Sequence, residues 1–307
     1  MNRERGIAAI TAILIVAVAA TAATLMLAQQ SAMLDQTMLV TSRAQADMYA
    51  RAGLDWARGT LLEDARTSGA FDSLGEAWAQ PIVGLPIERA VVSGLITDEQ
   101  GKFNLNNLLQ NTQRSDADMR AFGRLLSSVG APPEIAEAVL DWIAGDADLG
   151  GSGGAEDAYY LSLARPYRAA NVPMTQVEEL YRIRGFDAAT IARLKPYVTA
   201  LPARTALNVN TASDRVLAAV LDISPDKAAQ LVAERGTRPF GTAQDFADRA
   251  RKLGIETVPP GLAVASSFFS LRVQVAQDDV QLAVEALVQR DAAARNSTAI
   301  IWRRPRY

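Results

Sequence analysis

The sequence of 307 residues contains neither histidine nor cysteine. Without histidine the chain cannot form a Ser-His-Asp triad, a Cys-His pair or an imidazole metal site. Without cysteine it has no thiolate chemistry, zinc knuckle or disulfide framework. An excess of positive charge is also lacking, since 31 basic residues stand against 34 acidic ones. What remains is carboxylate chemistry, oxygen-ligated metals, serine or lysine nucleophiles, or no chemistry at all.

The N-terminus carries the one long apolar run of the sequence, from Ile7 to Ala28, without a charged residue. As a helix this run is about 33 Å long, enough to cross a bilayer core of roughly 30 Å. Arg3 and Arg5 precede it, and the next basic residue is Arg43. The positive-inside rule therefore predicts a single-pass protein of the bacterial inner membrane, with a cytoplasmic N-terminus and a periplasmic body.

A cleaved signal peptide is the alternative to this anchor. The sequence Ala20-Thr21-Ala22 could serve as its cleavage site. Cleavage there would leave Leu25, Met26 and Leu27 as an apolar stub on the mature protein. We therefore favour a retained anchor.

The leader before the apolar run is short and charged, and it ends in Gly6 immediately before Ile7. This junction resembles a class III, type IV prepilin-like leader. The resemblance implies that a prepilin peptidase cuts after Gly6 on the cytoplasmic side and that the new N-terminal residue, Ile7, is methylated. Most pilins and pseudopilins carry Glu at the fifth mature position, where this chain has Thr11.

Beyond the anchor, the absence of proline predicts that the helix continues from Gln29 to about Arg66, before a turn-rich segment at residues 69–86. Residues 89–97 and 102–105 are expected to form a hairpin around a turn at 98–101. Alternating apolar residues predict C-terminal strands at 268–276 and 280–289, and residues 299–304 could add a final strand. Helical spacing dominates residues 106–261, with a capping box at Thr175–Glu178. We expect an α+β fold in which a long N-terminal helix packs on an antiparallel sheet, with a large all-α domain inserted between strands.

Residues 208–246 are similar to helix-hairpin-helix modules that bind DNA, and they echo an earlier Asn104-Leu105-Asn106 with Asn208-Val209-Asn210. In such modules a glycine turn presents backbone N–H groups to phosphate. Here the turn at residues 222–225 has no glycine and contains a proline. Its basic residues are also offset by nearby acidic ones. We therefore predict a scaffold that does not bind nucleic acid, with the Asn pairs capping helices.

An acidic loop follows the helix that ends near residue 145, and five carboxylates flank or enter its glycine-rich centre. They would repel one another unless a cation neutralised them, and Ca²⁺ suits a flexible set of oxygen ligands. The candidate calcium ligands are Asp141, Asp146, Asp148, Glu156 and Asp157. The loop departs from the EF-hand pattern, and Asp141 is the weakest candidate because it lies within a helix. A solvated loop that caps the next helix, or a two-carboxylate hydrolase, are the alternatives.

Together these motifs resemble the type II secretion system protein K family, the large minor pseudopilin. The resemblance rests on the Gly6/Ile7 leader with Thr11 and on three further stretches, at residues 98–108, 141–160 and 208–212. It implies a pilin-like fold with an all-α insertion, a bound calcium ion and no enzymatic activity. It also implies a place at the pseudopilus tip with minor pseudopilins I and J, where the protein helps to start assembly for protein export across the outer membrane.

The expected domain organisation follows from this resemblance and from the patterns above. It consists of a leader (1–6), a transmembrane segment (7–28), the pilin-like helix and first strands (29–105), the all-α insertion (106–261) and the C-terminal strands (262–307). The alternative is a membrane-tethered DNA-uptake or other binding protein that uses the helix-hairpin-helix-like domain.

Overall fold

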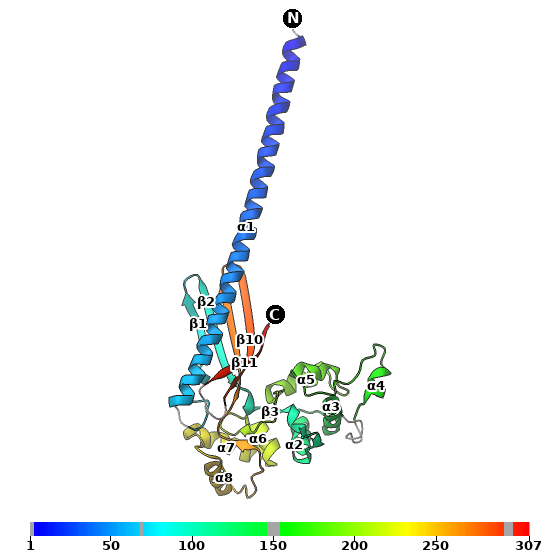
Figure 1. The fold of residues 1–307 in the computed structure, drawn as a ribbon, viewed down its shortest axis with the longest axis vertical. Helices are drawn as coiled ribbons and strands as arrows, with labels where there is room; N and C mark the ends of the chain where they lie inside the picture. Colours follow the sequence, from blue (N-terminus) through cyan, green and yellow to red (C-terminus); the bar gives the residue numbers. More distant parts are fainter. Residues whose placement is uncertain (1–2, 68–69, 146–153, 292–296, 307) are drawn as a thin grey trace.

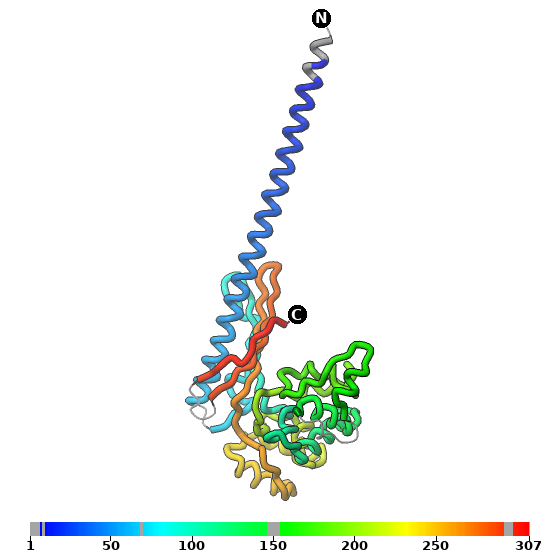
Figure 2. The backbone as a smooth tube through the Cα atoms, turned by 45° about the vertical axis from the view of Figure 1, so that its right-hand side comes forward, coloured from blue at the N-terminus to red at the C-terminus, as the bar shows by residue number. Residues whose placement is uncertain are grey.

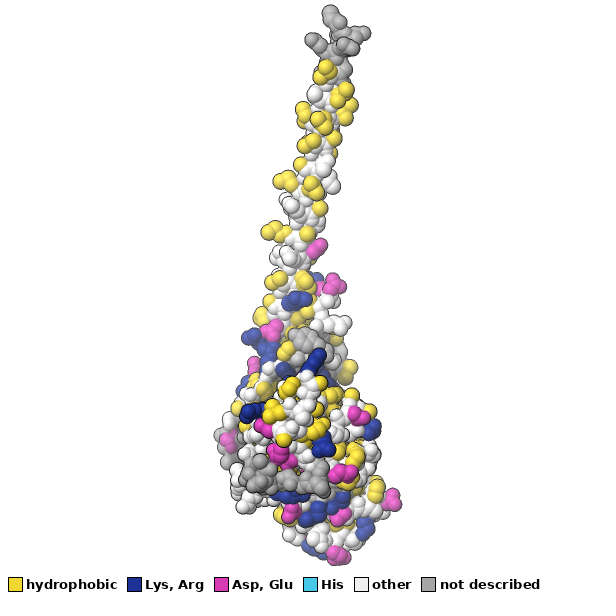
Figure 3. All heavy atoms as spheres, turned by 90° about the vertical axis from the view of Figure 1, so that its right-hand side faces the viewer, with side chains coloured by type: hydrophobic (Ala, Val, Ile, Leu, Met, Phe, Trp, Pro, Cys, Tyr) yellow, Lys and Arg dark blue, Asp and Glu magenta, His cyan; other side chains and the backbone are white. Residues whose placement is uncertain are grey.

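The computed structural model describes residues 3–67, 70–145, 154–291 and 297–306, with the side chains of residues 3–6, 8 and 9 left aside. One helix, α1 (Arg3–Thr67), dominates the molecule, and at 1.5 Å per residue it is about 98 Å long. Its N-terminal half extends away from a body of one sheet and one helical domain (Figure 1). Hydrophobic side chains cover this extended part, whereas charges of both signs are mixed on the body (Figure 3). The prediction that the anchor continues as one helix is confirmed.

The body next to α1 is a five-stranded antiparallel sheet with the order β1-β2-β9-β10-β11. Its strands are β1 (Ile82–Ile87), β2 (Ala90–Asp98), β9 (Phe268–Gln277), β10 (Val280–Arg290) and β11 (Thr298–Pro305), and a short 3₁₀ helix η1 (Ala77–Ala79) precedes them. The three C-terminal strands match the prediction. The chain therefore leaves the sheet after β2 and returns to it in β9, about 170 residues later (Figure 2).

The first core lies between α1 and this sheet. The buried face of α1 combines small and large apolar residues, namely Ala46, Ala50, Leu54, Ala57 and Leu61. This spacing of three or four residues keeps them on one side of the helix. Inward-facing side chains of β2, β9 and β10 pack against this face of the helix, among them Val273 and Val275 in β9. A Cβ at Gly53 would lie 2.9 Å from Val273 Cγ1, so glycine allows α1 to pack closely on β9.

The inserted domain, between β2 and β9, is mostly helical and has a separate core. Its α-helices are α2 (Asp116–Ser128), α3 (Ala136–Ile143), α4 (Asp157–Leu161), α5 (Ala188–Leu194), α6 (Asp214–Leu221), α7 (Pro225–Thr237) and α8 (Ala243–Lys252). Its 3₁₀ helices are η2 (Glu99–Gly101), η3 (Leu105–Leu108), η4 (Pro133–Ile135), η5 (Val177–Arg182) and η6 (Lys195–Tyr197). Its two-residue strands are β3 (Phe103–Asn104), β4 (Leu109–Gln110), β5 (Gln113–Arg114), β6 (Val198–Thr199), β7 (Leu207–Asn208) and β8 (Leu262–Ala263).

The predicted hairpin of residues 89–97 and 102–105 is wrong. Strand β2 pairs instead with β1 and β9, while β3 pairs in parallel with β6 inside the helical domain. The reason lies in Asp98, whose side chain accepts a hydrogen bond from Gln100 N–H and begins η2. This turn takes the chain out of the sheet, and Phe103 then stacks on Phe122 in the helical core.

Two smaller predictions also need correction. Strand β1 falls at the end of the segment that the sequence marks only as rich in turns. The capping box lies one residue later than predicted, because Gln176 and Glu179 form it, and it begins the 3₁₀ helix η5 instead of an α-helix.

Candidate functional site

The acidic loop brings Asp141 next to the segment that begins α4. Asp141 lies in α3 and is 1% exposed. Its Oδ2 accepts a hydrogen bond of 2.7 Å from the N–H of Ala155, across the ends of the loop. Its Oδ1 is buried and has no hydrogen-bond partner among the described residues. Burial raises the pKa of this carboxyl, and the hydrogen bond from Ala155 partly offsets that effect.

The other predicted ligands are placed less completely. Glu156 is the residue before α4, and its side chain makes no capping hydrogen bond to the helix. The alternative in which this carboxylate caps the next helix is therefore wrong for Glu156. Asp157 Oδ1 accepts a 3.0 Å hydrogen bond from Ala169 N–H, and its Oδ2 lies 3.8 Å from Arg168 Nη1. Asp146 and Asp148 lie outside the described residues. The structure thus joins Asp141 to Ala155, but among the described residues the carboxylate oxygens of Asp141, Glu156 and Asp157 do not form a group within 4.8 Å of one another.

A second acidic group, which the sequence patterns do not reveal, lies where α1 ends. Carboxylate oxygens of Asp64, Asp72 and Glu76 lie within 4.8 Å of one another. Arg290, 1% exposed, already supplies a cation here: its Nη2 donates to Asp72 at 2.5 and 2.6 Å, and its Nη1 lies 3.3 Å from Asp64. The guanidinium also donates to Ser266 O at 2.7 Å. This group therefore ties α1, the following loop, β10 and the chain returning from the helical domain together.

Asp98 is the centre of a second buried polar cluster at the junction between sheet and helical domain. Its Oδ2 accepts hydrogen bonds from Thr211 Oγ1 at 2.6 Å, Ser266 Oγ at 2.7 Å and Asn208 Nδ2 at 2.9 Å. Burial raises the pKa of Asp98 to about 6, although these hydrogen bonds favour the ionised form. A Cβ at Gly101 would lie 2.7 Å from Thr211 Oγ1, so only glycine at position 101 allows η2 to approach Thr211 this closely.

The two clusters share Ser266, whose N–H donates to Asp72 and whose hydroxyl donates to Asp98. Two stretches singled out in the sequence, residues 98–108 and 208–212, thus meet at one junction that holds the helical domain on the sheet. The sequence shows the stretches but not that they contact each other, because 110 positions separate Asp98 from Asn208.

The echoed Asn motifs perform matching roles. Asn106 accepts from Met174 N–H at 2.8 Å and donates to Met174 O at 2.9 Å, while Asn210 accepts from Phe240 N–H at 2.8 Å and donates to Phe240 O at 2.9 Å. The first Asn of each pair accepts from the N–H of the second. Asn104 caps η3 as predicted. Asn106, Asn208 and Asn210 instead form hydrogen bonds with loop residues and do not cap helices.

Parallel two-residue bridges complete the similarity of the two halves. Strand β3 pairs with β6 at the end of the first half, and β7 pairs with β8 at the end of the second. The helical domain is therefore built from two units of the same plan, each clamped by one buried Asn.

The helix-hairpin-helix-like turn offers no free basic surface. Ser224 caps α7 with proline at its first position, as the sequence predicts. The four basic residues of this region all make contacts within the chain: Arg215 with Ser128 O, Lys227 with Gly254 O, Arg235 with Val209 O and Arg238 with Asp245. This arrangement agrees with a scaffold rather than a phosphate-binding site.

Family models match two adjacent stretches of the chain. Both are described as type II secretion system protein K, one covering residues 101–203 and the other residues 207–267. They correspond to the two halves of the helical domain. A relative of the same description from Pseudomonas aeruginosa is 35% identical over 298 residues, which cover 94% of this chain and 89% of the relative. The chain belongs to the type II secretion system protein K family.

Other relatives agree with this membership. The protein K of Klebsiella pneumoniae is 31% identical over 94% of this chain and 93% of its own length. In structure the chain is similar to one from the GspK-GspI-GspJ complex of enterotoxigenic Escherichia coli, with a TM-score of 0.74 and 23% identity over 89% of this chain and 99% of that chain. The resemblance and the fold class predicted from the sequence are confirmed, and the protein is a minor pseudopilin of a type II secretion system.

The N-terminal anchor also fits this family. Among the described residues, one helix, α1, has the length and apolar composition needed to cross a membrane. Ile7 is exposed on α1, and the Thr11 hydroxyl donates to Ile7 O at 3.1 Å.

Proposed function

We propose that this protein K occupies the tip of the periplasmic pseudopilus together with minor pseudopilins I and J, and that it helps to start pseudopilus assembly without catalysing a reaction. The observation that carries the proposal is the position of the helical domain, which lies at the end of the body away from the extended part of α1 (Figure 1). A further subunit stacked on that end would clash with it. The structural similarity to a chain of the GspK-GspI-GspJ complex supports the choice of partners.

Thr11 supports the same position. A hydroxyl that donates to its own helix cannot supply the carboxylate that would neutralise the N-terminal amine of a neighbouring subunit. Entry below an existing subunit would leave that charge unpaired in lipid, which is costly. The first position in the filament avoids this cost, since no subunit is already there.

Processing and topology complete the proposal. The prepilin peptidase removes residues 1–6 after Gly6, and Ile7 becomes the methylated N-terminus. The chain then stays in the inner membrane with its body in the periplasm, because Arg3 and Arg5 hold the leader on the cytoplasmic side until it is cut.

Quantitative intact-mass spectrometry of purified pseudopili tests both parts. We expect a chain without residues 1–6 and with one added methyl group, in a small fraction of the amount of the major subunit. Expression without the peptidase should leave the chain uncut and exclude it from filaments. Amounts comparable to the major subunit would contradict the tip position, and a cut near Ala22 would contradict the anchor.

We also propose that the acidic loop binds calcium, with Asp141 supplying an oxygen ligand from α3. The orphaned, buried Oδ1 of Asp141 carries this proposal, because a cation would replace the missing hydrogen bond and favour the ionised carboxylate. Asp141 thus becomes the strongest candidate, although its position within a helix ranked it last. The ion would supply charge neutralisation that fixes the loop against α3.

Asp141→Asn should weaken calcium binding about tenfold or more, since even residues that only support metal ligands contribute 10–100-fold. Calcium titration of the full chain in detergent, followed by its melting temperature, measures this. Wild-type protein should melt at a higher temperature as calcium is added. Asp279→Asn, at an exposed turn, is the matched control. Equal calcium-dependent shifts in the two variants would rule out Asp141 as a ligand.

A further inference from the structure

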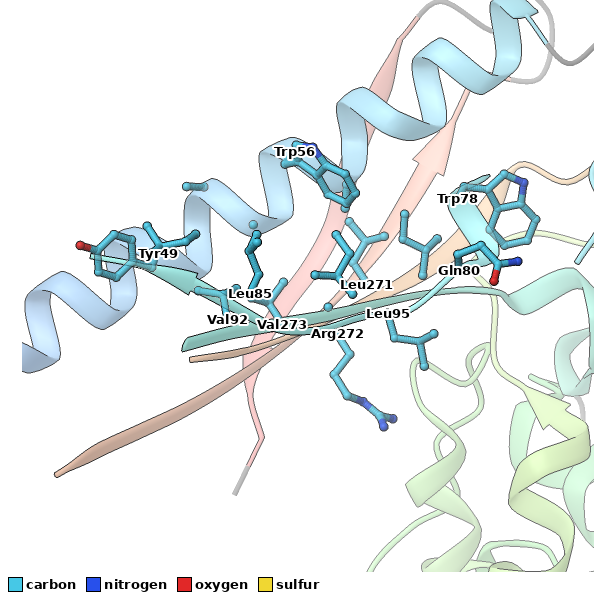
Figure 4. A pocket seen from close by; sticks show the side chains of 17 residues that line it. Tyr49, Trp56, Trp78, Gln80, Leu85, Val92, Leu95, Leu271, Arg272 and Val273 are labelled. Carbon is cyan, nitrogen blue, oxygen red and sulfur yellow. The ribbon is translucent and has the colours of Figure 1, made fainter. Parts of the chain in front are cut away.

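A cleft of about 790 Å³ lies between the sheet and the helical domain. Strands β9, β10 and β11 form one wall of it, and η5, η6 and β6 form the other. The cleft is on the face of the sheet away from α1. Figure 4 shows this at Arg272, whose side chain leaves the sheet on the side opposite Tyr49 and Trp56 of α1. The volume lies within the range of roughly 300–1,000 Å³ that is typical of ligand sites.

A row of charges crosses the sheet wall of this cleft. Arg272 in β9 faces Glu285 in β10, which in turn faces Arg304 in β11. Opposite charges in facing positions stabilise a sheet. Arg304 Nη2 lies 3.3 Å from Glu285 Oε2, and Arg306, just after β11, places its Nη1 3.1 Å from Oε1. One carboxylate therefore serves three guanidinium groups, which leaves this wall with an excess of positive charge.

Arg272 is the guanidinium that Glu285 leaves without a hydrogen bond. Its Nη2 lies 3.8 Å from Glu285 Oε1, which is beyond hydrogen-bond distance. Its Nε is buried and has no hydrogen-bond partner in the part of the chain that the structure describes. Buried donors without an acceptor are rare in folded proteins. The side chain as a whole is 41% exposed, so an anion in the cleft could supply the acceptor that the chain does not.

The other charged residues of the cleft do not neutralise this excess. Lys195 pairs with Glu178 at 2.5 Å, and Lys102 pairs with Glu99 at 2.7 Å. Glu178 also lies 3.8 Å from Arg304, but it is already shared with Lys195. Five basic side chains and three carboxylates line the cleft in all, so two positive charges remain in excess.

Trp302 adds an apolar surface beside the guanidinium groups. Its ring is partly buried and packs on the small cluster of Leu201, Phe268 and Leu287. The Cζ of Arg304 lies 4.5 Å from the ring centre. A small inorganic anion would use only the charged part of this site. A peptide that carries an apolar side chain next to a carboxylate would use both parts.

The position of the cleft argues against an anionic lipid headgroup as its occupant. Arg303, the neighbour of Arg304, contacts Asp47 of α1. Asp47 is 19 residues beyond Ala28, where the apolar run ends, which corresponds to about 29 Å of helix. The headgroups of a membrane that α1 crosses therefore lie too far away to fill the cleft.

We propose that this cleft binds an extended acidic segment of a partner protein. A carboxylate of the segment accepts hydrogen bonds from Arg272 and Arg304, and a neighbouring apolar side chain of the segment lies on Trp302. Charge-assisted hydrogen bonds to guanidinium groups are among the strong ones, and they favour a carboxylate over an amide of the same shape. This binding does not depend on the position of the protein in the pseudopilus.

Binding of a fluorescent peptide to the full chain in detergent tests the proposal. The probe is a peptide of about eight residues that alternates aspartate with leucine or phenylalanine, and the control peptide has asparagine at each aspartate position. Fluorescence anisotropy should show that the acidic peptide binds about tenfold or more tightly than the control peptide. Inorganic phosphate at the concentration of the peptide should not displace it.

Arg272→Gln should weaken binding of the acidic peptide about tenfold or more, since it removes a charged donor. It should leave the melting temperature nearly unchanged, because no hydrogen bond of this side chain holds the described fold together. Arg89→Gln is the matched control, since it removes the same charge from a turn of the same sheet where the side chain is 77% exposed. The control should leave the affinity nearly unchanged.

Four results would overturn the proposal. Equal affinities for the two peptides, or no measurable binding of either, would mean that the cleft does not recognise carboxylates. Equal losses in Arg272→Gln and Arg89→Gln would mean that overall charge, and not the cleft, attracts the peptide. Displacement by phosphate would reveal a site for small anions only. A lower melting temperature with unchanged affinity in Arg272→Gln would mean that Arg272 only supports the fold.

Discussion

Replacing Arg290 by methionine is expected to lower the free energy of unfolding by about 3–5 kcal/mol, the usual cost of breaking a buried ion pair from one side. The variant leaves Asp72, which is fully buried, without its guanidinium partner. It also removes the contact to Asp64 and the hydrogen bond to Ser266 O. Methionine preserves most of the apolar stem, but it removes the guanidinium group whose Cζ lies 4.8 Å from the centre of the Phe269 ring.

Denaturant unfolding of the full chain in detergent measures this effect. The control is Arg303→Met, which breaks the partly exposed contact with Asp47 and should cost no more than about 1 kcal/mol. A double variant that also replaces Asp72 by Asn should recover part of the loss, because it removes the buried charge that has lost its guanidinium partner. Similar costs for Arg290→Met and Arg303→Met would show that the buried cluster does not hold the junction together.

Replacing Asn106 or Asn210 by alanine is expected to cost about 2–4 kcal/mol each, because buried backbone groups lose their hydrogen-bond partners. For Asn106 these groups are the N–H and the carbonyl of Met174 and the carbonyl of Leu201. Asn210 holds the corresponding groups of Phe240. The two variants should therefore be destabilised to a similar degree, although they lie in different halves of the helical domain.

Two further variants separate the donor from the acceptor role. Asn106→Asp still accepts from Met174 N–H but cannot donate to the two carbonyls, so it should be destabilised as well. Gln281→Ala, at an exposed position of β10, should change stability by no more than about 0.5 kcal/mol. Hydrogen exchange should show the loss of protection first in the half that carries the substitution. Loss of protection in both halves at once would contradict two separately clamped units.

Features with a short-range cause were predictable from the sequence. Alternation identified β9 and β10, because the apolar side chains of each strand turn toward the core, and the absence of proline identified α1. The Ser224-Pro225 start of α7 followed from capping rules. The hairpin failed because residues 102–105 have an alternating pattern that suits a strand, while the turn at Asp98 depends on contacts with Thr211 and Ser266.

The candidate site was only partly predictable for the same reason. The sequence names Asp141 among the acidic residues but cannot show that its Oδ1 is buried without a partner, since that depends on how residues 154–157 pack on α3. The cluster around Arg290 was not found at all. Asp64, Asp72 and Arg290 lie in three separate segments, and no local motif marks a buried Arg in a strand.

The sequence was sufficient to predict the long apolar N-terminal helix, the order of helix, sheet and inserted helical domain, and the resemblance that the family match confirms. These depend on composition and on periodicity within a few turns or strands. Only the folded chain shows which carboxylates contact the Arg290 guanidinium and how residues 98–108 meet residues 208–212. Each of these requires side chains more than a hundred positions apart to lie within hydrogen-bond or van der Waals distance, and only the packing of the complete chain sets those distances.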